Sequence, residues 1–300
     1  MTFHELVLDA RSRFIRAGIR EQLAGLDAEL LARHVLGWTR ARFLADWHED
    51  APERFAPEYE RLVARRERRE PIPYITGVQE FWGLTFEVNP AVLIPRPETE
   101  FILEEAIACL EAATGTGSPA APDRQPVRPS PLEIVDVGTG SGCLAVALAR
   151  HFPDARIFAT DLSGAALAVA RRNAFRHGVA HRVQFVETSF LTAIEIAPTM
   201  IVSNPPYVPS VSAPGLVPEV RDFEPELAVF GGPDGLDGLR ELLSQAAAKL
   251  APAGWLIVEF GYGQEDAVTD LIANFPCYSL MKIRRDLQGI PRTAVVRKAA

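Results

Sequence analysis

The chain has 300 residues, of which 48% are hydrophobic, enough for one large domain or two modest ones with apolar cores. A formal net charge of −8 argues against a protein that grips nucleic acid through its phosphates, and no apolar run is long enough to cross a membrane. The three cysteines form no Cys-x-x-Cys pair and the six histidines are scattered, so neither disulfides nor a metal site is expected. Since no basic-then-apolar leader begins the chain, the sequence predicts a soluble cytoplasmic protein.

Residues 1–75 are expected to form a small helical domain. Apolar residues recur there at helical spacing among Arg, Glu and Ala, and a further helix is expected over residues 57–70, before a proline-rich stop. Residues 76–100 change character, because residues 81–88 favour a strand, as part of a hairpin. This hairpin linker leads into a helix over residues 101–113.

The rest of the chain, residues 101–300, alternates strand and helix patterns, which predicts an α/β domain with a mainly parallel sheet. The last two strands are expected to close the sheet as an antiparallel hairpin. Residues 114–131 are rich in Gly, Pro, Ser and Ala, which is typical of a flexible surface insertion. The expected strands cover residues 132–137, 156–160, 183–186, 201–203, 254–259, 278–284 and 292–297.

A glycine-rich turn joins the first of these strands to a helix. The strand ends at Val137, and Gly138-Thr139-Gly140-Ser141-Gly142 follows directly. Strand, glycine-rich turn and helix is a nucleotide-binding arrangement, because glycines let a ligand approach the backbone and the helix start offers free N–H groups. Asp161, about twenty residues further on at the end of the next strand, is placed to accept hydrogen bonds from ribose hydroxyls.

The surroundings of this turn favour one adenosine-bearing ligand over others. Asp136, just before the turn, is expected to lie near a positively charged or amine-bearing group, which fits S-adenosylmethionine better than a dinucleotide. The loop at residues 187–190, after the third strand, would lie beside the adenine. Right-handed crossovers then place the glycine turn, Asp161, this loop and Asn204 along one edge of the sheet.

The fourth strand ends in Asn204-Pro205-Pro206-Tyr207, a rigid polar turn at the edge where ligands bind in open α/β sheets. The Asn204 carboxamide and the Pro205 carbonyl oxygen are two acceptors that can hold both hydrogens of a planar NH2 group. That geometry turns the nitrogen lone pair toward an electrophile, so both residues are predicted to catalyse by orientation. Tyr207 adds an aromatic face for a flat substrate or a sulfonium cation. The simpler interpretation is a stiff strand-to-loop turn with an Asx-turn asparagine.

These motifs together resemble one known family. The chain is similar to the PrmC/HemK family of protein-(glutamine) methyltransferases over nearly its whole length, apart from the 114–131 segment. The Asn-Pro-Pro-Tyr turn is shared with adenine-modifying methyltransferases, whereas the Pro-Arg-Pro-Glu-Thr-Glu segment and the helical start single out the release-factor branch. The resemblance is carried by residues 73–77 (Pro-Tyr-Ile-Thr-Gly), 81–84 (Phe-Trp-Gly-Leu), 94–100 (Ile-Pro-Arg-Pro-Glu-Thr-Glu), 136–142, 204–207 and 234–236 (Asp-Gly-Leu).

The resemblance implies a seven-stranded, Rossmann-like class I methyltransferase sheet with a small N-terminal helical domain that grips a protein substrate. It implies methyl transfer from S-adenosylmethionine to the side-chain amide nitrogen of the glutamine in the Gly-Gly-Gln motif of class I peptide chain release factors. The family usually has an Asp in the adenine-side loop, where this chain has Thr188. By position, Gly138, Thr139, Gly140, Ser141, Gly142, Asp161, Ser189 and Asn204 would bind the cofactor, and Asn204, Pro205, Pro206 and Tyr207 the glutamine.

Three other functions remain open. The first is an adenine-directed DNA methyltransferase, since a flipped-out adenine presents the same kind of NH2 group to the Asn-Pro-Pro-Tyr turn. The acidic composition and the lack of an obvious base-reading domain argue against it. A ribosomal-protein glutamine methyltransferase is the second, although Pro97-Glu98-Thr99 fits the release-factor type better. A protein that binds the cofactor without catalysis is the third, and the intact Asn-Pro-Pro-Tyr turn argues against it.

Overall fold

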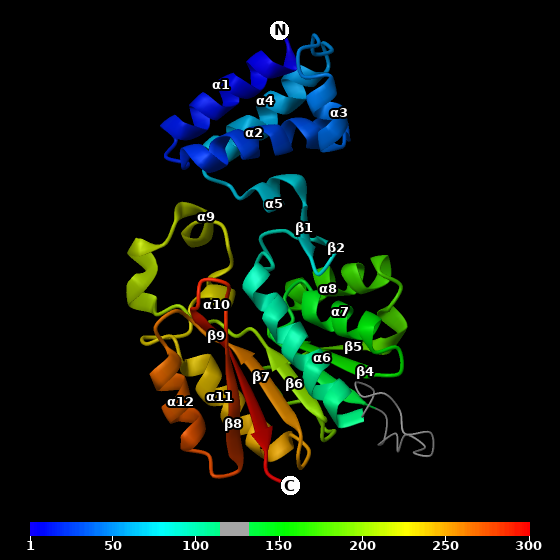
Figure 1. The fold of residues 1–300 in the computed structure, drawn as a ribbon, viewed down its shortest axis with the longest axis vertical. Helices are drawn as coiled ribbons and strands as arrows, with labels where there is room; N and C mark the ends of the chain where they lie inside the picture. Colours follow the sequence, from blue (N-terminus) through cyan, green and yellow to red (C-terminus); the bar gives the residue numbers. More distant parts are fainter. Residues whose placement is uncertain (115–131) are drawn as a thin grey trace. The chain divides into compact units, whose positions relative to one another are not determined.

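The structure, a computed structural model, describes residues 1–114 and 132–300. The expected insertion at residues 114–131 lies outside the described residues, except for Thr114 at the end of a helix. The described chain forms two compact units (Figure 1). The first contains Met1–Val78 and Val217–Phe223, and the second contains Gln79–Leu216 and Glu224–Ala300.

The first unit is helical. A capping box begins its first helix, because Thr2 accepts from the backbone of Glu5 and the Glu5 side chain accepts from the backbone of Thr2. Buried aromatic and aliphatic side chains of the helices form its core. The helix expected over residues 57–70 begins at Phe55 and ends at Glu67. The helices are α1 (Phe3–Arg16), α2 (Glu21–Leu36), α3 (Arg40–Ala45), α4 (Phe55–Glu67), α5 (Ile72–Thr76) and α9 (Pro218–Arg221).

Partly buried ion pairs join helix α9 to the other helices of this unit. Glu219 accepts hydrogen bonds from Arg66 Nη1 at 2.8 Å and from Arg69 Nη2 at 2.7 Å. Arg66 also donates from Nε to Asp27 on α2, at 2.9 Å. The sequence placed Glu219 within the 101–300 domain, whereas its charge packs against helical residues that precede that range.

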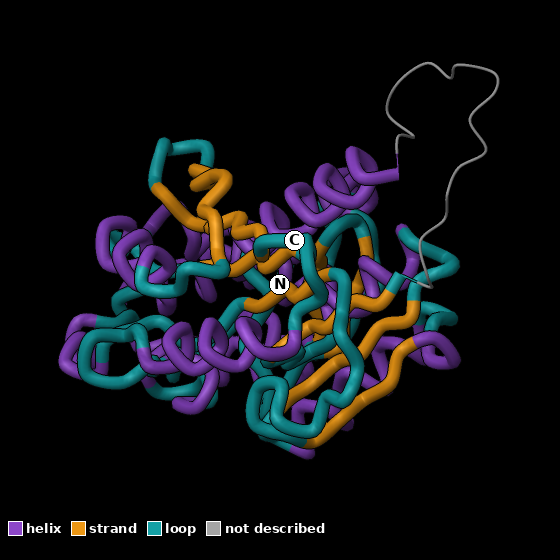
Figure 2. Tube along the Cα trace, turned by 90° about the horizontal axis from the view of Figure 1, so that it is seen from below, coloured by secondary structure: helices purple, strands orange, loops and turns teal. Residues whose placement is uncertain are grey.

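The second unit is built on a seven-stranded sheet, which confirms the predicted fold class. The strand order is β5-β4-β3-β6-β7-β9-β8, in which β3 to β7 are parallel and β9 is antiparallel to β7 and β8. Figure 2 distinguishes the strands, in orange, from the helices, in purple, that cover them. The strands are β3 (Glu133–Val137), β4 (Arg156–Asp161), β5 (Val183–Glu187), β6 (Met200–Ser203), β7 (Trp255–Glu259), β8 (Tyr278–Arg285) and β9 (Pro291–Lys298).

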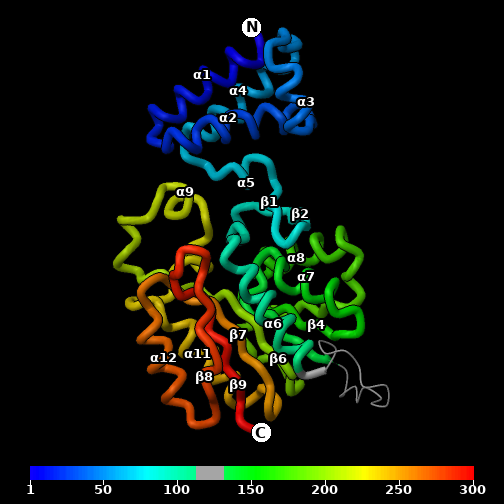
Figure 3. Tube along the Cα trace, in the orientation of Figure 1, coloured from blue at the N-terminus to red at the C-terminus, as the bar shows by residue number. Residues whose placement is uncertain are grey.

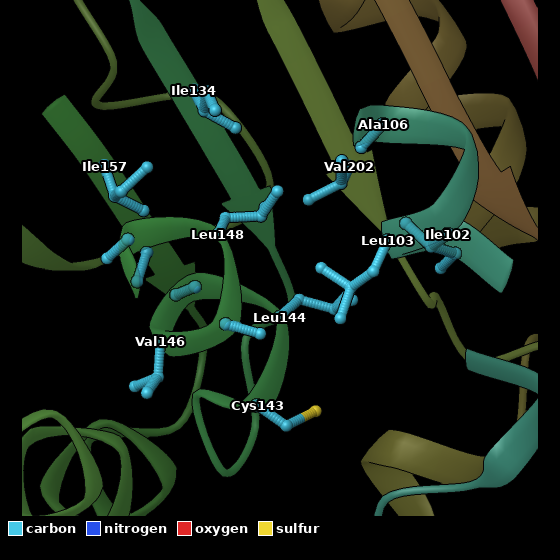
Figure 4. Close-up of a cluster of buried hydrophobic side chains, with 14 of the residues drawn as sticks. Ile102, Leu103, Ala106, Ile134, Cys143, Leu144, Val146, Leu148, Ile157 and Val202 are labelled. Carbon is cyan, nitrogen blue, oxygen red and sulfur yellow. The ribbon is translucent and has the colours of Figure 1, made fainter. Parts of the chain in front are cut away.

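Helices cover both faces of the sheet, because successive strand residues point to opposite faces. Ile134 and Val202 pack under α6, α7 and α8, whereas Val135 and Ile201 pack under α11 and α12. Figure 3 labels these helices along the chain. Leu103 of α6 and Leu144 of α7 point toward one another in the first of these cores (Figure 4). The longer helices are α6 (Glu100–Thr114), α7 (Cys143–His151), α8 (Gly164–Arg176), α11 (Asp237–Lys249) and α12 (Glu265–Ala273).

A small hairpin precedes the sheet and packs on α8. The segment expected as a strand over residues 81–88 contains the hairpin turn, since Trp82 and Gly83 have φ values of 54° and 69°. The buried Asn173 of α8 accepts from the backbone N–H of Glu87 and donates to its carbonyl. The hairpin strands and short helices are β1 (Val78–Phe81), β2 (Leu84–Glu87), η1 (Pro97–Thr99), η2 (Ala180–Arg182), η3 (Ser210–Gly215) and α10 (Glu226–Val229).

Candidate active site

A cavity of about 220 Å³ lies at the carboxyl ends of the parallel strands of the second unit. Strand β3 lies between β4 and β6 in the sheet. From β3 the chain adds β4 and β5 on one side and then returns to add β6 and β7 on the other side. Such a reversal of strand order opens a crevice in which α/β proteins bind ligands. The segments that follow β3, β4, β5 and β6 all contribute residues to the lining.

The glycine-rich turn forms one wall of this cavity. Gly138 and Gly140 have φ values of 71° and 53°, a region that residues with a Cβ rarely adopt. Gly138, Thr139, Gly140 and Ser141 line the cavity, whereas Gly142 does not. A Cβ on Gly142 would lie 3.0 Å from the Cβ of Ala170 on α8, so this glycine allows close packing of the turn against that helix.

Asp136 supports the turn from within the protein. Its Oδ2 accepts from Thr139 Oγ1 at 2.6 Å and from the backbone N–H of Ala145 at 3.0 Å. Burial raises the pKa of this carboxyl to about 7. Asp136 does not belong to the cavity lining, so the expectation that it lies beside a ligand amine is wrong. It holds the shape of the glycine turn instead.

Asp161 forms the next part of the wall, at the end of β4. Its two carboxylate oxygens accept from the backbone N–H groups of Gly140 and Ser163, both at 2.9 Å. The backbone N–H of Leu162 also bonds this carboxylate, and a carboxylate with about four acceptor sites keeps one for a ligand hydroxyl. Burial raises the pKa of this carboxyl above its usual value. Helix α8 begins at Gly164 with Ser163 as its cap, so Leu162 stays outside the helix and is 57% exposed in the lining.

The loop after β5 supplies three lining residues, Thr188, Ser189 and Phe190. Glu187, the carboxylate nearest to the position where the family usually has an Asp, is exposed and does not line the cavity. Thr188 keeps the loop in place, because its N–H donates to the Asp161 carbonyl and its hydroxyl accepts from the N–H of Ala193. Leu162 and Phe190 were not singled out from the sequence, and both add apolar surface near Asp161.

The Asn-Pro-Pro-Tyr turn closes the cavity beside β3. Asn204, Pro205 and Pro206 line it, directly after a β6 residue, Ser203, whose hydroxyl donates to the Val137 carbonyl at 2.8 Å. Among the described residues, no donor contacts the Asn204 Oδ1 atom or the Pro205 carbonyl oxygen. Both acceptors therefore remain available to a bound NH2 group, as the orientation hypothesis requires.

Tyr207 does not lie where it could stack on a ligand, contrary to the expectation from the sequence. It does not belong to the cavity lining, and its hydroxyl donates to Glu259 Oε1 at 3.0 Å. Glu259, the last residue of β7, also accepts from Thr99 Oγ1 through Oε2 at 2.8 Å. Thr99 Oγ1 in turn accepts from Asn204 Nδ2 at 3.0 Å. A continuous hydrogen-bonded network thus joins Asn204, Thr99, Glu259 and Tyr207.

Electrostatics within this network are set by burial. Thr99 is 3% and Glu259 1% exposed. Burial raises the pKa of Glu259 to about 7, against the hydrogen bonds from Thr99 and Tyr207, which favour its charged form. Burial and the nearby Glu259 carboxylate raise the pKa of the Tyr207 hydroxyl, which keeps it protonated as a donor. Sequence reasoning missed Glu259, although it follows the β7 residue that pairs with Ser203.

A second glycine-rich loop packs against the back of the Asn-Pro-Pro-Tyr turn. Ideal Cβ atoms on Gly231 and Gly235 would lie 2.3 Å from the Pro206 carbonyl oxygen and 2.2 Å from the Tyr207 carbonyl oxygen. The Gln264 side chain donates to the Tyr207 carbonyl at 3.0 Å. This packing was not identified from the sequence, because backbone-to-backbone contact leaves no sequence signal beyond the glycines themselves.

Two other segments complete the walls. Residues of the 91–99 segment and of the 225–228 segment both line the cavity. Arg96 joins these walls through Nη2, which donates to the buried carboxylate of Glu224 at 2.6 Å. In the part of the chain that the structure describes, no group of three or more His, Cys, Asp or Glu side chains could hold a metal ion. None of the described helices is both long enough and apolar enough to span a bilayer.

Each of the two parts of the chain matches a known protein family. Residues 5–77 match the PrmC N-terminal domain, and residues 126–214 match the methyltransferase small domain. The second unit therefore contains a methyltransferase domain. Its fold is similar to that of a methyltransferase from Pyrococcus furiosus, with a TM-score of 0.50 at 18% identity over 73% of this chain and 91% of that one.

Two full-length relatives carry the same name. A release factor glutamine methyltransferase from Koribacter versatilis (strain Ellin345) is 41% identical over 275 residues, which cover 91% of each chain. Another, from Moorella thermoacetica (strain ATCC 39073 / JCM 9320), is 38% identical over 293 residues, which cover 97% of each chain. Identity at this level over nearly the whole length of both partners means that this chain belongs to the release factor glutamine methyltransferase family.

Proposed function

We propose that the chain transfers a methyl group from S-adenosylmethionine to the side-chain amide nitrogen of the glutamine in the Gly-Gly-Gln motif of class I release factors. Family membership supports the substrate class, and the relatives found do not favour the ribosomal-protein or adenine-directed alternatives. The observation that carries the mechanism is the pair of free acceptors, Asn204 Oδ1 and the Pro205 carbonyl oxygen, in the wall of the cavity.

The cavity lining fits S-adenosylmethionine, which supplies an electrophilic methyl group when bound. The backbone of Gly138 to Ser141 allows close approach of the ligand. Asp161 retains an acceptor site for a ribose hydroxyl, and Leu162 and Phe190 provide apolar surface for the adenine ring. Ser189 offers a hydroxyl at the adenine side, where Thr188 replaces the usual carboxylate of the family. Gly142 acts indirectly, by packing the turn against α8.

The glutamine amide is held by its two N–H hydrogens. One donates to Asn204 Oδ1 and the other to the Pro205 carbonyl oxygen, which fixes the plane of the amide. A nitrogen held in this way presents its lone pair to the methyl carbon, so the N–C bond forms as the S–C bond breaks. The nitrogen becomes acidic once it is alkylated and then releases a proton to solvent. Pro206 shapes the cavity wall, and Tyr207 acts through Glu259 rather than on the substrate.

We propose that residues 1–75 bind the release factor, that residues 76–100 form a hairpin linker and that residues 101–300 carry the methyl transfer. The match of residues 5–77 to the PrmC N-terminal domain supports the first of these assignments. The helices of the first unit share a core of their own, separate from the two cores of the sheet. The cavity lining that the structure describes contains no residue of the first unit, so this unit can bind the release factor without taking part in methyl transfer.

Labelled S-adenosylmethionine and a purified class I release factor test the proposal. We expect label in the intact release factor and none in a version whose Gly-Gly-Gln glutamine is replaced by alanine. Parallel reactions contain duplex DNA or purified ribosomal proteins in place of the release factor. Label that persists in the alanine version, or that enters only DNA or a ribosomal protein, would contradict the proposed function.

A further inference from the structure

The direction of the Asn204 carboxamide is set by its neighbours. A carboxamide has an acceptor end and a donor end of nearly the same shape, so packing alone does not distinguish the two orientations. Only the orientation with Oδ1 toward the cavity can accept from a substrate NH2 group. In the structure the donor end, Nδ2, is bonded to Thr99 Oγ1 at 3.0 Å.

Glu259 determines which group donates in the bond between Asn204 and Thr99. An ionised carboxylate has no hydrogen, so it can only accept. Thr99 must therefore donate its single hydroxyl hydrogen to Glu259 Oε2, at 2.8 Å, which leaves its oxygen as an acceptor toward Asn204. Tyr207 donates to the other carboxylate oxygen and holds Glu259 in place. The order of donors and acceptors along the network has one solution while Glu259 is charged.

We propose that Thr99 and Glu259 are positioning residues that select the reactive orientation of Asn204. This inference depends on the proposed function, because it assigns a cause to the acceptor geometry on which methyl transfer relies. Neither residue is required to touch the glutamine. Thr99 acts on Asn204 directly, and Glu259 acts on Asn204 through Thr99.

Protonation of Glu259 would reverse the network. A neutral carboxyl can donate to Thr99 Oγ1, which frees the Thr99 hydrogen to bond Asn204 Oδ1 and turns the donor end of Asn204 to the cavity. The pKa of Glu259, about 7, lies where this change would be visible. Of the charged groups around it, Glu98 raises this pKa and Arg292 lowers it, and Arg292 is itself paired with Asp286 at 3.2 Å.

Two substitutions of one residue test the role of Thr99. Thr99→Val keeps the shape of the side chain and removes the hydroxyl, and Thr99→Ser keeps the hydroxyl. We expect Thr99→Val to lower kcat for methylation of a class I release factor by about tenfold, the worth of one hydrogen bond, with unchanged affinity for S-adenosylmethionine. Thr99→Ser should retain kcat close to that of the wild type.

The same assays include Asn204→Ala, which separates this inference from the proposed function. If Asn204→Ala is inactive while Thr99→Val turns over like the wild type, the positioning role is wrong and the orientation mechanism stands. If Thr99→Ser loses as much activity as Thr99→Val, or if Thr99→Val loses cofactor affinity instead of kcat, the positioning role is also wrong. If Asn204→Ala is fully active, the orientation mechanism itself fails.

The pH dependence of kcat tests the role of Glu259. We expect kcat of the wild type to rise with pH through about 7, as Glu259 ionises. In Glu259→Gln this rise should be absent, because the amide does not titrate, and kcat should be lower at alkaline pH. Circular dichroism and cofactor affinity, measured on the same samples, show whether the variant is folded. A folded Glu259→Gln protein with the wild-type pH profile would overturn the inference.

Discussion

Replacing Gly231 by alanine tests whether the packing behind the Asn-Pro-Pro-Tyr turn fixes the position of the reactive amide. Gly231 is buried, and an added Cβ would lie 2.3 Å from the Pro206 carbonyl oxygen and 2.6 Å from the Gly235 carbonyl oxygen. Real Cβ atoms essentially never approach other heavy atoms to less than 3.0 Å. The Pro206 carbonyl must therefore withdraw by at least about 0.7 Å, and both neighbours are backbone atoms that cannot rotate away.

The size of the effect follows from this displacement. Overpacking of a well-packed interior costs about 1–3 kcal/mol of unfolding free energy. A shift of about 1 Å in a positioning group costs up to about 100-fold in rate. Because Pro206 is bonded directly to Pro205, we expect Gly231→Ala to lower kcat by roughly 10- to 100-fold. Cofactor affinity should change little, since Gly231 does not line the cavity.

Gly215→Ala is the matched control. Gly215 is exposed, an added Cβ meets no atom within 4 Å, and neither of the two glycines has a positive φ. Both variants therefore add the same methyl group without backbone strain, and only one adds a clash. Methylation of a class I release factor gives kcat, and urea unfolding gives stability. Equal kcat values for Gly231→Ala and Gly215→Ala would refute the claim that this packing fixes the turn.

Three further predictions concern the charged groups. Asp161→Asn should weaken S-adenosylmethionine binding, measured by calorimetry, because it removes an acceptor from the ribose side; unchanged affinity would contradict that role. The buried carboxyl of Asp136 binds a proton more tightly when folded, since its pKa rises from 3.8 to about 7, so its contribution to stability is present at pH 4 and lost as pH rises to about 7. Urea unfolding should then show Asp136→Asn gaining up to about 4 kcal/mol relative to the wild type between pH 4 and pH 8, and a constant difference would refute this. Glu219→Gln should cost about 1.5 kcal/mol of unfolding free energy, because Arg66 and Arg69 lose a charged partner while Arg66 keeps its bond to Asp27, whereas Asp222→Asn in the same segment should have no measurable effect.

The fold was predictable because its strands and helices have strong local patterns. The apolar runs that end at Val137 and Ser203 are parallel strands of one sheet, as the alternation of strand and helix patterns predicts. The hairpin at residues 81–88 was assigned less well, because Trp82 adopts a positive φ that aromatic side chains rarely take. The limits of the helical unit depend on Glu219, whose partners lie about 150 residues earlier in the chain.

The predicted site residues divide into those that line the cavity and those that support it. The glycine turn, Asp161 and Asn204 follow strand ends directly, so the sequence places them on the cavity edge. Tyr207 and Asp136 carry groups that suggest ligand contact, yet both bond to protein atoms instead. The choice between ligand and protein partners depends on side-chain direction, which strand and turn patterns do not specify.

The network behind Asn204 could not be predicted in the same way. Thr99 and Glu259 are separated by 160 positions, and they meet because the last residue of η1 contacts the end of β7, the strand that pairs with β6. The one indication in the sequence was that Glu259 is an acidic residue at the end of a strand, β7, that pairs with β6. A single sequence gives no reason to prefer Glu259 over the other acidic residues that follow strands.

The turnover of Asn204→Ala tests the central claim most directly, with the affinity for S-adenosylmethionine measured on the same protein. Removal of the carboxamide leaves the glutamine amide with the Pro205 carbonyl oxygen as its remaining acceptor in the turn. The account predicts that methylation of a class I release factor is abolished while cofactor affinity is retained. Methylation at the wild-type rate by Asn204→Ala would contradict the account.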